Sequence, residues 1–332
     1  MRKTIAKELL ESPELVIIPS AYDCVSAKAA ELCGFKAAML SGDALSMGIN
    51  AIPDIGTNTL DEVIWVTEHI TQTATQPLII DLQEGFGKPF NAYFGIKRLL
   101  RYGILGVKIS DKGARCNGLS GDRLELSDYE RIARIRAAAI ALEGSDCLLI
   151  AEVGMDPGEN FEEAVSRAKH YRELGADVIL PSGLLNCGKD TQEHLELLKK
   201  FHEATPEIQK WYVMDPETPY EASMDDIYAC GYKFISVDYS ARMSALFMLH
   251  AGNYLYENGT NVIVSKMKER FPNASSKFRG ASEHFGIRDK SLVNLETRIW
   301  GEDYPDLDKM SAHLIYNPYR ARYPDPDPES AE

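Results

Sequence analysis

The sequence predicts a (β/α)8 barrel followed by a helical C-terminal extension. Eight short, β-rich apolar runs alternate with amphipathic stretches, and each run is apolar enough to be buried on both faces, as in a parallel sheet. Several amphipathic stretches end at a glycine just before the next run, as at Gly34, Gly103, Gly175 and Gly231, where glycine commonly terminates a helix. A doubly wound open sheet is the alternative. Its glycine-rich dinucleotide fingerprint is absent after the first run, which favours the barrel.

The predicted elements follow one another along the chain in strict alternation. Strands are predicted at residues 15–19, 37–41, 78–82, 106–110, 147–153, 178–182, 211–214 and 233–237. Helices are predicted at 21–33, 59–73, 91–102, 128–142, 160–174, 192–202 and 223–230. Beyond residue 240 the alternation stops, and 241–256, 261–271 and 291–300 favour helix. We therefore expect a barrel domain at 1–245, a helical extension at 246–320 and a disordered, proline-rich acidic tail at 321–332.

Composition excludes several classes of partner. The net charge of −14 and the absence of a basic stripe argue against nucleic acid and against anionic membrane surfaces. No uncharged apolar run approaches the roughly 18 residues of a membrane helix. The six cysteines are scattered without a C-x-x-C pair, and the N-terminus lacks the apolar segment of a secretory signal. We expect a cytoplasmic protein that acts on a small-molecule substrate.

The segment at residues 78–87, Leu-Ile-Ile-Asp-Leu-Gln-Glu-Gly-Phe-Gly, is the most informative stretch. An apolar strand ends in Asp81, and an acidic, glycine-rich turn follows at once. In a (β/α)8 barrel, side chains at the carboxyl ends of the strands form the active site. The other polar groups at predicted strand ends are Ser41-Gly42-Asp43, Gln83 and Glu84, Lys108, Ser110-Asp111-Lys112, Glu152, Ser182-Gly183, Asp215 and Asp238. Such carboxylates could hold a hard divalent cation, or they could be solvated charges at the rim.

An ordered series of motifs runs along the first three quarters of the chain. It comprises Pro19-Ser-Ala-Tyr-Asp23, Ser41-Gly42, Pro53-Asp54, Asp81-Leu-Gln-Glu-Gly-Phe-Gly87, Gly106-Val-Lys-Ile-Ser-Asp111 and Ala114-Arg-Cys-Asn117. In content and order this series resembles the isocitrate lyase/phosphoenolpyruvate mutase superfamily, over roughly residues 10–250. The resemblance is nearest to the branch of phosphoenolpyruvate mutases and small 2-oxo-acid lyases.

The resemblance implies an enzyme that makes or breaks a C–C or P–C bond beside a carbonyl or carboxylate through a stabilised enolate. It also implies Mg²⁺ and a homo-oligomer, a dimer or tetramer, in which the last barrel helix is exchanged between subunits. We expect metal ligands at Asp81, Glu84 and Asp111. The expected catalytic residues are Lys108, Glu152 and Cys116, the last in a gating loop at 113–121. The expected substrate-binding residues are Tyr22, Ser41, Gly42, Asp43, Asp54, Asn117 and Ser182.

The chain departs from the family pattern at three charged positions. Gln83 replaces the second aspartate of the signature, Ser110 replaces a glutamate, and Glu152 stands where an arginine usually grips the substrate carboxylate. We therefore expect weakened metal binding and a non-standard substrate with fewer negative charges, or with an amine or hydroxyl that donates to Glu152. Oxaloacetate, isocitrate and phosphonopyruvate should be poor substrates. A pathway of specialised biosynthesis would suit such a change. Two alternatives remain open: a catalytically silent barrel that acts as a binding or assembly protein, and an enzyme of the same fold with metal-free, altered chemistry.

Overall fold

The computed structural model describes residues 4–113, 126–154, 160–185, 187–215 and 220–275. In these ranges, eight parallel strands form a closed barrel in chain order, and β1 pairs with β8 to close it. This confirms the predicted (β/α)8 barrel over the open sheet, and every predicted strand overlaps an observed one. The strands are β1 (Val16–Ala21), β2 (Ala38–Leu40), β3 (Leu78–Asp81), β4 (Gly106–Ser110), β5 (Leu148–Glu152), β6 (Val178–Leu180), β7 (Gln209–Met214) and β8 (Phe234–Val237).

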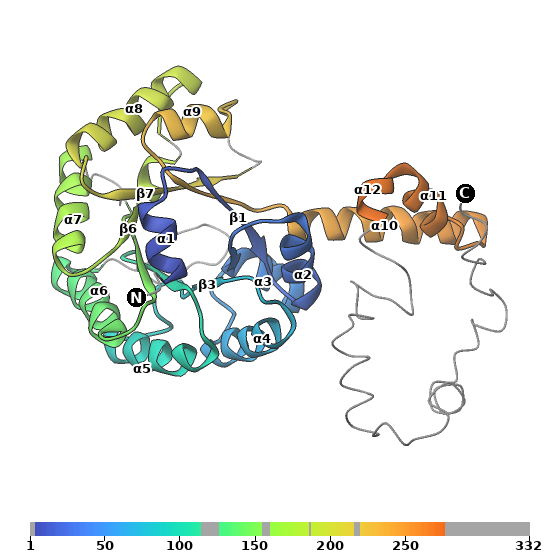
Figure 1. The fold of residues 1–332 in the computed structure, drawn as a ribbon, viewed down its shortest axis with the longest axis horizontal. Coiled ribbons are helices and arrows are strands. Elements are labelled where there is room, and N and C mark those ends of the chain that lie inside the picture. The colour runs from blue at the N-terminus through green and yellow to red at the C-terminus, as the bar shows by residue number, and fades with distance from the viewer. Residues whose placement is uncertain (1–3, 114–125, 155–159, 186, 216–219, 276–332) are drawn as a thin grey trace. The chain divides into compact units, whose positions relative to one another are not determined.

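Helices surround the strands, as Figure 1 shows. Most begin with the side chain of a Ser, Thr, Asn or Asp residue that accepts a hydrogen bond from the first turn, as Ser127 does from Glu130 N. The helices after β1 to β8 are α2 (Cys24–Cys33), α3 (Gly42–Asn50), α4 (Leu60–Thr73), α5 (Pro89–Leu99), α6 (Asp128–Leu142), α7 (Phe161–Glu173), α8 (Thr191–Ala204), α9 (Met224–Ala229) and α10 (Ser240–Asn258).

Two short α-helices of the barrel were not predicted from the sequence. The first is α1 (Ile5–Glu11), which precedes β1, and the second is α3, which follows β2. Gly42 and the polar Ser41 made this second segment look like a loop. In the structure Ser41 is the N-cap of α3, and its Oγ accepts a hydrogen bond from Ala44 N. A seven-residue segment such as α1 is too short for its hydrophobic periodicity to predict a helix.

The barrel has two apolar cores, because side chains along a strand alternate between its two faces. The inner core holds side chains such as Ile79, Ile150 and Phe234, together with Ala6 and Leu9 of α1. Helix α1 therefore closes the N-terminal end of the barrel, which we call the floor. The outer core lies between strands and helices and contains Ile80, Val107 and other residues of the opposite strand face. The C-terminal ends of the strands, above the inner core, carry polar side chains instead.

The chain forms two compact units, Met1–Val264 and Ser265–Glu332. The first unit includes α10, whose Ser240 and Ala241 are buried and whose later turns carry exposed apolar side chains. Beyond it, α11 (Ile263–Arg270) continues into the second unit, where α12 (Pro272–Ser275) follows. In the part of the chain that the structure describes, no helix is long and apolar enough to cross a membrane.

Candidate active site

A cavity of about 400 Å³ opens at the C-terminal ends of the strands. Every strand contributes to its wall. Among the described residues its lining consists of Ser20, Met39, Ser41, Asp43, Asp54, Asp81, Gln83, Lys108, Lys112, Glu152, Leu180, Ser182, Leu185, Val213, Asp215, Ser236, Val237, Asp238 and Arg242. The cavity is therefore the convergent polar mouth that the barrel prediction placed at the strand ends.

Four charged side chains form a continuous chain across this mouth. Lys108 Nζ lies 3.0 Å from Asp81 Oδ2 and 3.0 Å from Glu152 Oε2. Lys112 Nζ lies 3.0 Å from Glu152 Oε1. Strand register produces the contacts: Asp81 stands opposite Lys108 across β3 and β4, and Glu152 stands opposite Ser110, two residues after Lys108. Residues two apart on a strand face the same side, so all these groups point into the barrel.

The two carboxylates of this chain respond differently to burial. Burial raises the pKa of Asp81. The charge of Lys108 opposes this rise, and the nearby charge of Glu152 adds to it. Burial also acts to raise the pKa of Glu152, but contact with both Lys108 and Lys112 outweighs it and holds that pKa well below its usual range. Burial would lower the pKa of Lys108, but the charges of Asp81 and Glu152 prevail and raise it. The two carboxylates therefore favour the charged form of Lys108.

The signature turn after β3 positions Asp81. Gln83 adopts a left-handed backbone conformation with φ 51°, and its N–H donates to Asp81 Oδ1 at 2.9 Å. Its side-chain amide donates to Asp54 Oδ2 at 2.9 Å. The backbone N–H of Gly42 approaches Asp81 Oδ2 at 3.4 Å, and a Cβ added at Gly42 would lie 1.6 Å from Gln83 Nε2. A side chain at position 42 would therefore have to displace the Gln83 amide, which donates to Asp54.

A second group of charges lies on the other side of the mouth, around β8 and β1. Arg242, in the first turn of α10, contacts Asp43 Oδ2 at 3.7 Å and Asp215 Oδ1 at 3.5 Å. Ser20 Oγ donates to Asp238 Oδ1 at 2.6 Å. Burial raises the pKa of Asp238, and although the bond from Ser20 opposes this, a hydrogen bond and repulsion with Asp43 raise it further. Asp238 therefore takes up a proton more readily than an ordinary aspartate.

Most of the residues predicted from the sequence meet in this cavity: Ser41, Asp43, Asp54, Asp81, Lys108, Glu152 and Ser182 line it, and Gly42 lies beside Asp81. Tyr22 does not line it and packs instead against Gly48 of α3. Cys116 and Asn117, with most of the predicted gating loop, lie outside the described residues.

The structure separates the three predicted metal ligands. Asp81 is in the cavity, whereas Glu84 is not among its lining residues and its charge acts on Arg134. Asp111 is buried elsewhere, accepting hydrogen bonds from Gly154 N at 2.8 Å and from the Tyr171 hydroxyl at 3.0 Å. Burial raises the pKa of Asp111 to about 6. Among the described residues, no three His, Cys, Asp or Glu side chains are grouped so as to hold a metal ion.

The structure also corrects the sequence-based view of Glu152 as an uncompensated anion facing the substrate. Both of its carboxylate oxygens contact lysine ammonium groups, so its charge is balanced within the protein. Sequence reasoning assigned no role to Lys112 or Arg242, since neither lies within a strand. The sequence offered one signal for each of them: both are basic residues that follow an acidic residue just after a strand end.

Comparison with known proteins places the chain in a family. The phosphoenolpyruvate phosphomutase family model matches residues 6–251. The chain is 32% identical to the 2-methylisocitrate lyase of Aeropyrum pernix over 237 residues, covering 70% of this chain and 72% of that protein.

Solved structures share the fold. The structure resembles 2,3-dimethylmalate lyase with a TM-score of 0.71 and 22% identity. The match covers 90% of this chain and 100% of that chain. It resembles phosphoenolpyruvate phosphomutase from Streptomyces platensis subsp. rosaceus with a TM-score of 0.70 and 23% identity, covering 89% and 98% of the two chains. The chain therefore belongs to the phosphoenolpyruvate phosphomutase family, within the isocitrate lyase/phosphoenolpyruvate mutase superfamily that its motifs predicted.

Proposed function

We propose that this enzyme is a lyase that breaks or forms a carbon–carbon bond next to a carbonyl or carboxylate, through an enolate. One observation carries the proposal: the cavity combines a buried ammonium, Lys108, with Asp238, a carboxyl group whose protonated form burial favours. An enolate needs positive charge where its oxygen develops and an acid–base group near its carbon. The relatives named 2-methylisocitrate lyase and 2,3-dimethylmalate lyase support this reaction class.

The charges that line the cavity favour a substrate with few negative charges. Six described carboxylates line it, at positions 43, 54, 81, 152, 215 and 238, against three basic groups, at 108, 112 and 242. Acidic groups therefore outnumber basic groups in the described wall, and the cost of bringing in an anion rises with its charge. The preference for few negative charges comes from the whole wall rather than from Glu152 alone.

A single substrate carboxylate would find its partners at the more open cations. The side chains of Lys112 and Arg242 are 22% and 26% exposed, whereas Lys108 is only 12% exposed. Lys112 and Arg242 would orient the carboxylate, and Lys108 would face the carbonyl oxygen. This arrangement gives the two kinds of cation different tasks, one in binding and one in the reaction.

The proton carrier in this proposal is Asp238. Its raised pKa and its place in the cavity wall suit it to give a proton to, or take one from, a carbon at the mouth. Cys116 remains a prediction for the same task. A catalytically silent barrel, the alternative, would bury the four-charge chain at a cost in stability without a use for it.

Pyruvate release from a graded set of acids tests the proposal. Suitable substrates are 2-methylisocitrate, 2,3-dimethylmalate and 4-hydroxy-2-oxopentanoate, because each yields pyruvate while the number of carboxylates falls. We expect kcat/KM to rise as that number falls, and phosphonopyruvate to be a poor substrate. Fastest turnover of the tricarboxylate would reject the charge argument. Binding without pyruvate release from any of them would favour the silent barrel.

Variants then assign the roles in that assay. Asp238→Asn should lower kcat by about 10²-fold or more, the usual contribution of a positioned acid–base group. Asp61→Asn is the matched control, because the Asp61 side chain is 79% exposed on α4 and pairs with the surface residue Arg98. Equal activity of the two variants would remove Asp238 from the mechanism.

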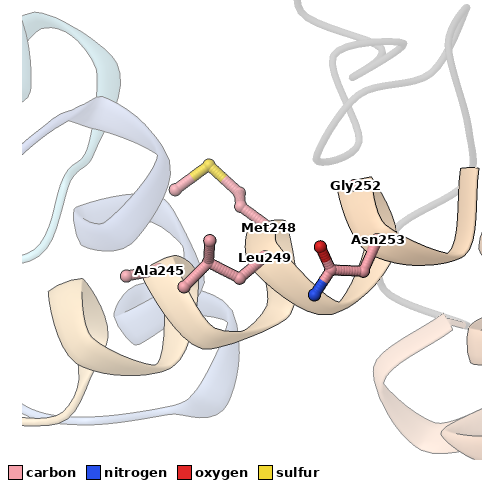
Figure 2. A pocket seen from close by; sticks show the side chains of 5 residues that line it. All are labelled: Ala245, Met248, Leu249, Gly252 and Asn253. Carbon is pink, nitrogen blue, oxygen red and sulfur yellow. The ribbon is translucent and has the colours of Figure 1, made fainter. Parts of the chain in front are cut away.

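We also propose that a second copy of this chain covers α10. Ala245, Met248, Leu249, Gly252 and Asn253 line a hollow along this helix, and Figure 2 shows their side chains. Met248 is 67% exposed and Leu249 is 64% exposed, which is unusual for neighbouring large apolar side chains. The resemblance implies a dimer or tetramer with an exchanged last helix, and this face suits that arrangement.

Light scattering after size exclusion tests the assembly. The unaltered chain should elute as a dimer or tetramer, and Met248→Lys with Leu249→Lys should shift it toward the monomer. Lys266→Glu on α11 is a suitable charge-changing control. A monomeric unaltered chain would reject this part of the proposal.

A further inference from the structure

The position of Lys108 conflicts with a divalent cation at this site. Its ammonium lies between the carboxylates of Asp81 and Glu152, 3.0 Å from an oxygen of each. In the order of the family motifs, Asp81 is the acid at which the resemblance places Mg²⁺. The cation that this carboxylate contacts in the present chain is a lysine carried by the neighbouring strand, β4.

The oxygens that would bind a metal are already engaged with N–H donors. Asp81 Oδ1 accepts from Gln83 N, and Asp81 Oδ2 accepts from Gly42 N and contacts Lys108. Glu152 Oε1 contacts Lys112, and Oε2 contacts Lys108. All four carboxylate oxygens of the two acids therefore have partners. A divalent cation at this point would have to displace donors and would be repelled by the ammonium at short range.

The remaining family ligand positions offer little negative charge. Gln83 is an amide whose Nε2 donates to Asp54. Ser110 is neutral, and its Oγ accepts a hydrogen bond from Lys112 N at 3.1 Å. Mg²⁺ prefers an octahedron of hard oxygen ligands, usually with one or two free carboxylates and several waters. The residues present do not fit that requirement.

We infer that Lys108 takes the place of the divalent cation, so that this chain works with a built-in ammonium as the positive centre of its active site. Its described partners, Asp81 and Glu152, use two of the three N–H groups of the ammonium, and Lys108 lines the cavity. The third N–H can donate to a substrate oxygen. The two carboxylates hold the ammonium in place and keep it charged, so Lys108 acts as an electrostatic donor and forms no covalent bond with the substrate.

The catalytic half of this inference rests on the lyase function proposed above, whereas the exclusion of the metal does not. A developing enolate oxygen needs a positive donor that is already in position. Because β3, β4 and β5 hold the three charged groups by strand register, Lys108 needs no rearrangement to meet that oxygen. The replacement also accounts for Gln83 and Ser110, since an ammonium needs fewer anionic partners than a divalent cation.

Calorimetry on protein stripped of metal with EDTA is the first experiment. Titration of the unaltered chain with MgCl₂ and with MnCl₂ should give no saturable heat through the millimolar range. Its melting temperature should also be the same in Mg²⁺ and in EDTA, because an ion that does not bind the native state cannot stabilise it. One-to-one Mg²⁺ binding that Asp81→Asn abolishes would overturn the inference. These readings need no substrate, so they stand apart from the success or failure of the lyase assay.

Removal of the ammonium should reverse this behaviour. Lys108→Ala frees one oxygen of each acid, and Mn²⁺ should bind this variant on the order of tenfold more tightly than the unaltered chain, or better. Lys28→Ala, on the surface of α2, is the control and should not change Mn²⁺ binding. If Lys108→Ala folds and binds Mn²⁺ no better than the control, the inference is wrong. If it does not fold, the titration of the unaltered chain decides.

Borohydride reduction tests the non-covalent role. Reduction in the presence of pyruvate should leave the mass of the protein unchanged, whereas a pyruvate-sized addition at Lys108 would show an imine and overturn the electrostatic role. Where the graded acids give turnover, EDTA should leave kcat unchanged. A fall in kcat that added Mg²⁺ restores would also contradict the inference.

Discussion

At the mouth of the barrel, Lys108 and Lys112 contact carboxylates, whereas at the floor the ammonium groups of Lys210 and Lys233 donate to backbone carbonyl oxygens. The acceptor of Lys210 is Thr205 O, and those of Lys233 are Leu9 O and Leu10 O, the latter at 2.9 Å. Burial lowers the pKa of both floor lysines, and that of Lys210 falls to about 8.

The difference shows how one side chain serves two purposes in one barrel. At the floor, Lys210 and Lys233 donate hydrogen bonds to backbone carbonyl oxygens. Burial of their charge is unfavourable there, because no carboxylate contacts either ammonium among the described residues. At the mouth the charge is retained by two acids, at the expense of desolvating all three groups. The contrast between the ends can be tested by replacing each lysine with methionine, which keeps the aliphatic length and removes the charge.

The largest effect is expected at the mouth. Lys108→Met leaves the carboxylates of Asp81 and Glu152 buried without the ammonium that lies between them. Glu152 keeps its contact with Lys112. The free energy of unfolding should fall by roughly 3 kcal/mol at pH 7, the usual cost of removing one partner of a buried ion pair. Urea denaturation measures it.

The pH dependence of the same variant sharpens that prediction. Without Lys108 the pKa of Asp81, already raised by burial, should rise further above its value in the unfolded chain. A carboxyl whose pKa is raised on folding favours the folded state at low pH, and that contribution is lost as the pH rises. The deficit of Lys108→Met should therefore shrink as the pH falls from 8 to about 5. A deficit that grows on acidification would contradict this reading.

A smaller effect is expected at the floor, from Lys210→Met. The folded protein binds this proton more weakly than the unfolded chain, because the pKa falls from 10.5 to about 8. The stability of the unaltered chain should therefore rise between pH 8 and pH 10, by about 2 kcal/mol, and the variant should lack this rise. Denaturation curves at several pH values measure the slope. Parallel curves for the two proteins would show that Lys210 is solvated.

The smallest effect is expected on the surface, where Lys28 Nζ lies 3.0 Å from Glu31 Oε2 on α2. Both side chains are about a quarter exposed, at 23% and 24%, so water competes with the pair. Lys28→Met should change the free energy of unfolding by less than about 1 kcal/mol. A loss as large as that of Lys108→Met would mean that burial does not distinguish the mouth from the surface.

Strands were predictable from the sequence because parallel strands buried on both faces give continuous apolar runs. Asp81 was identifiable for the same reason, as a carboxylate that ends such a run. The partners of Lys108 were not, because the register between β3, β4 and β5 cannot be read from one sequence. Register alone decides that Lys108 meets both Asp81 and Glu152, and so decides whether the mouth is an acid cluster or a chain of balanced charges.

One error in the site could have been avoided. Lys108 and Asp111 stand three positions apart, so in extended backbone they face opposite sides. Both could not belong to one cavity, and Asp111 indeed faces Tyr171 of α7. Asp43 was predicted to bind substrate, but its contact with Arg242 depends on α3 and on the start of α10, which one sequence does not bring together.

The contact between Lys233 and α1 joins residues separated by 223 and 224 positions. During synthesis, α1 leaves the ribosome first, yet the ammonium that donates to its carbonyl oxygens belongs to Lys233, the residue that precedes β8. The same holds for β1, whose neighbour β8 is the last strand made. The first quarter of the barrel must therefore wait, with an apolar strand edge unpaired, until β8 has emerged. Nascent chains that stop short of β8 expose this edge and should need chaperones.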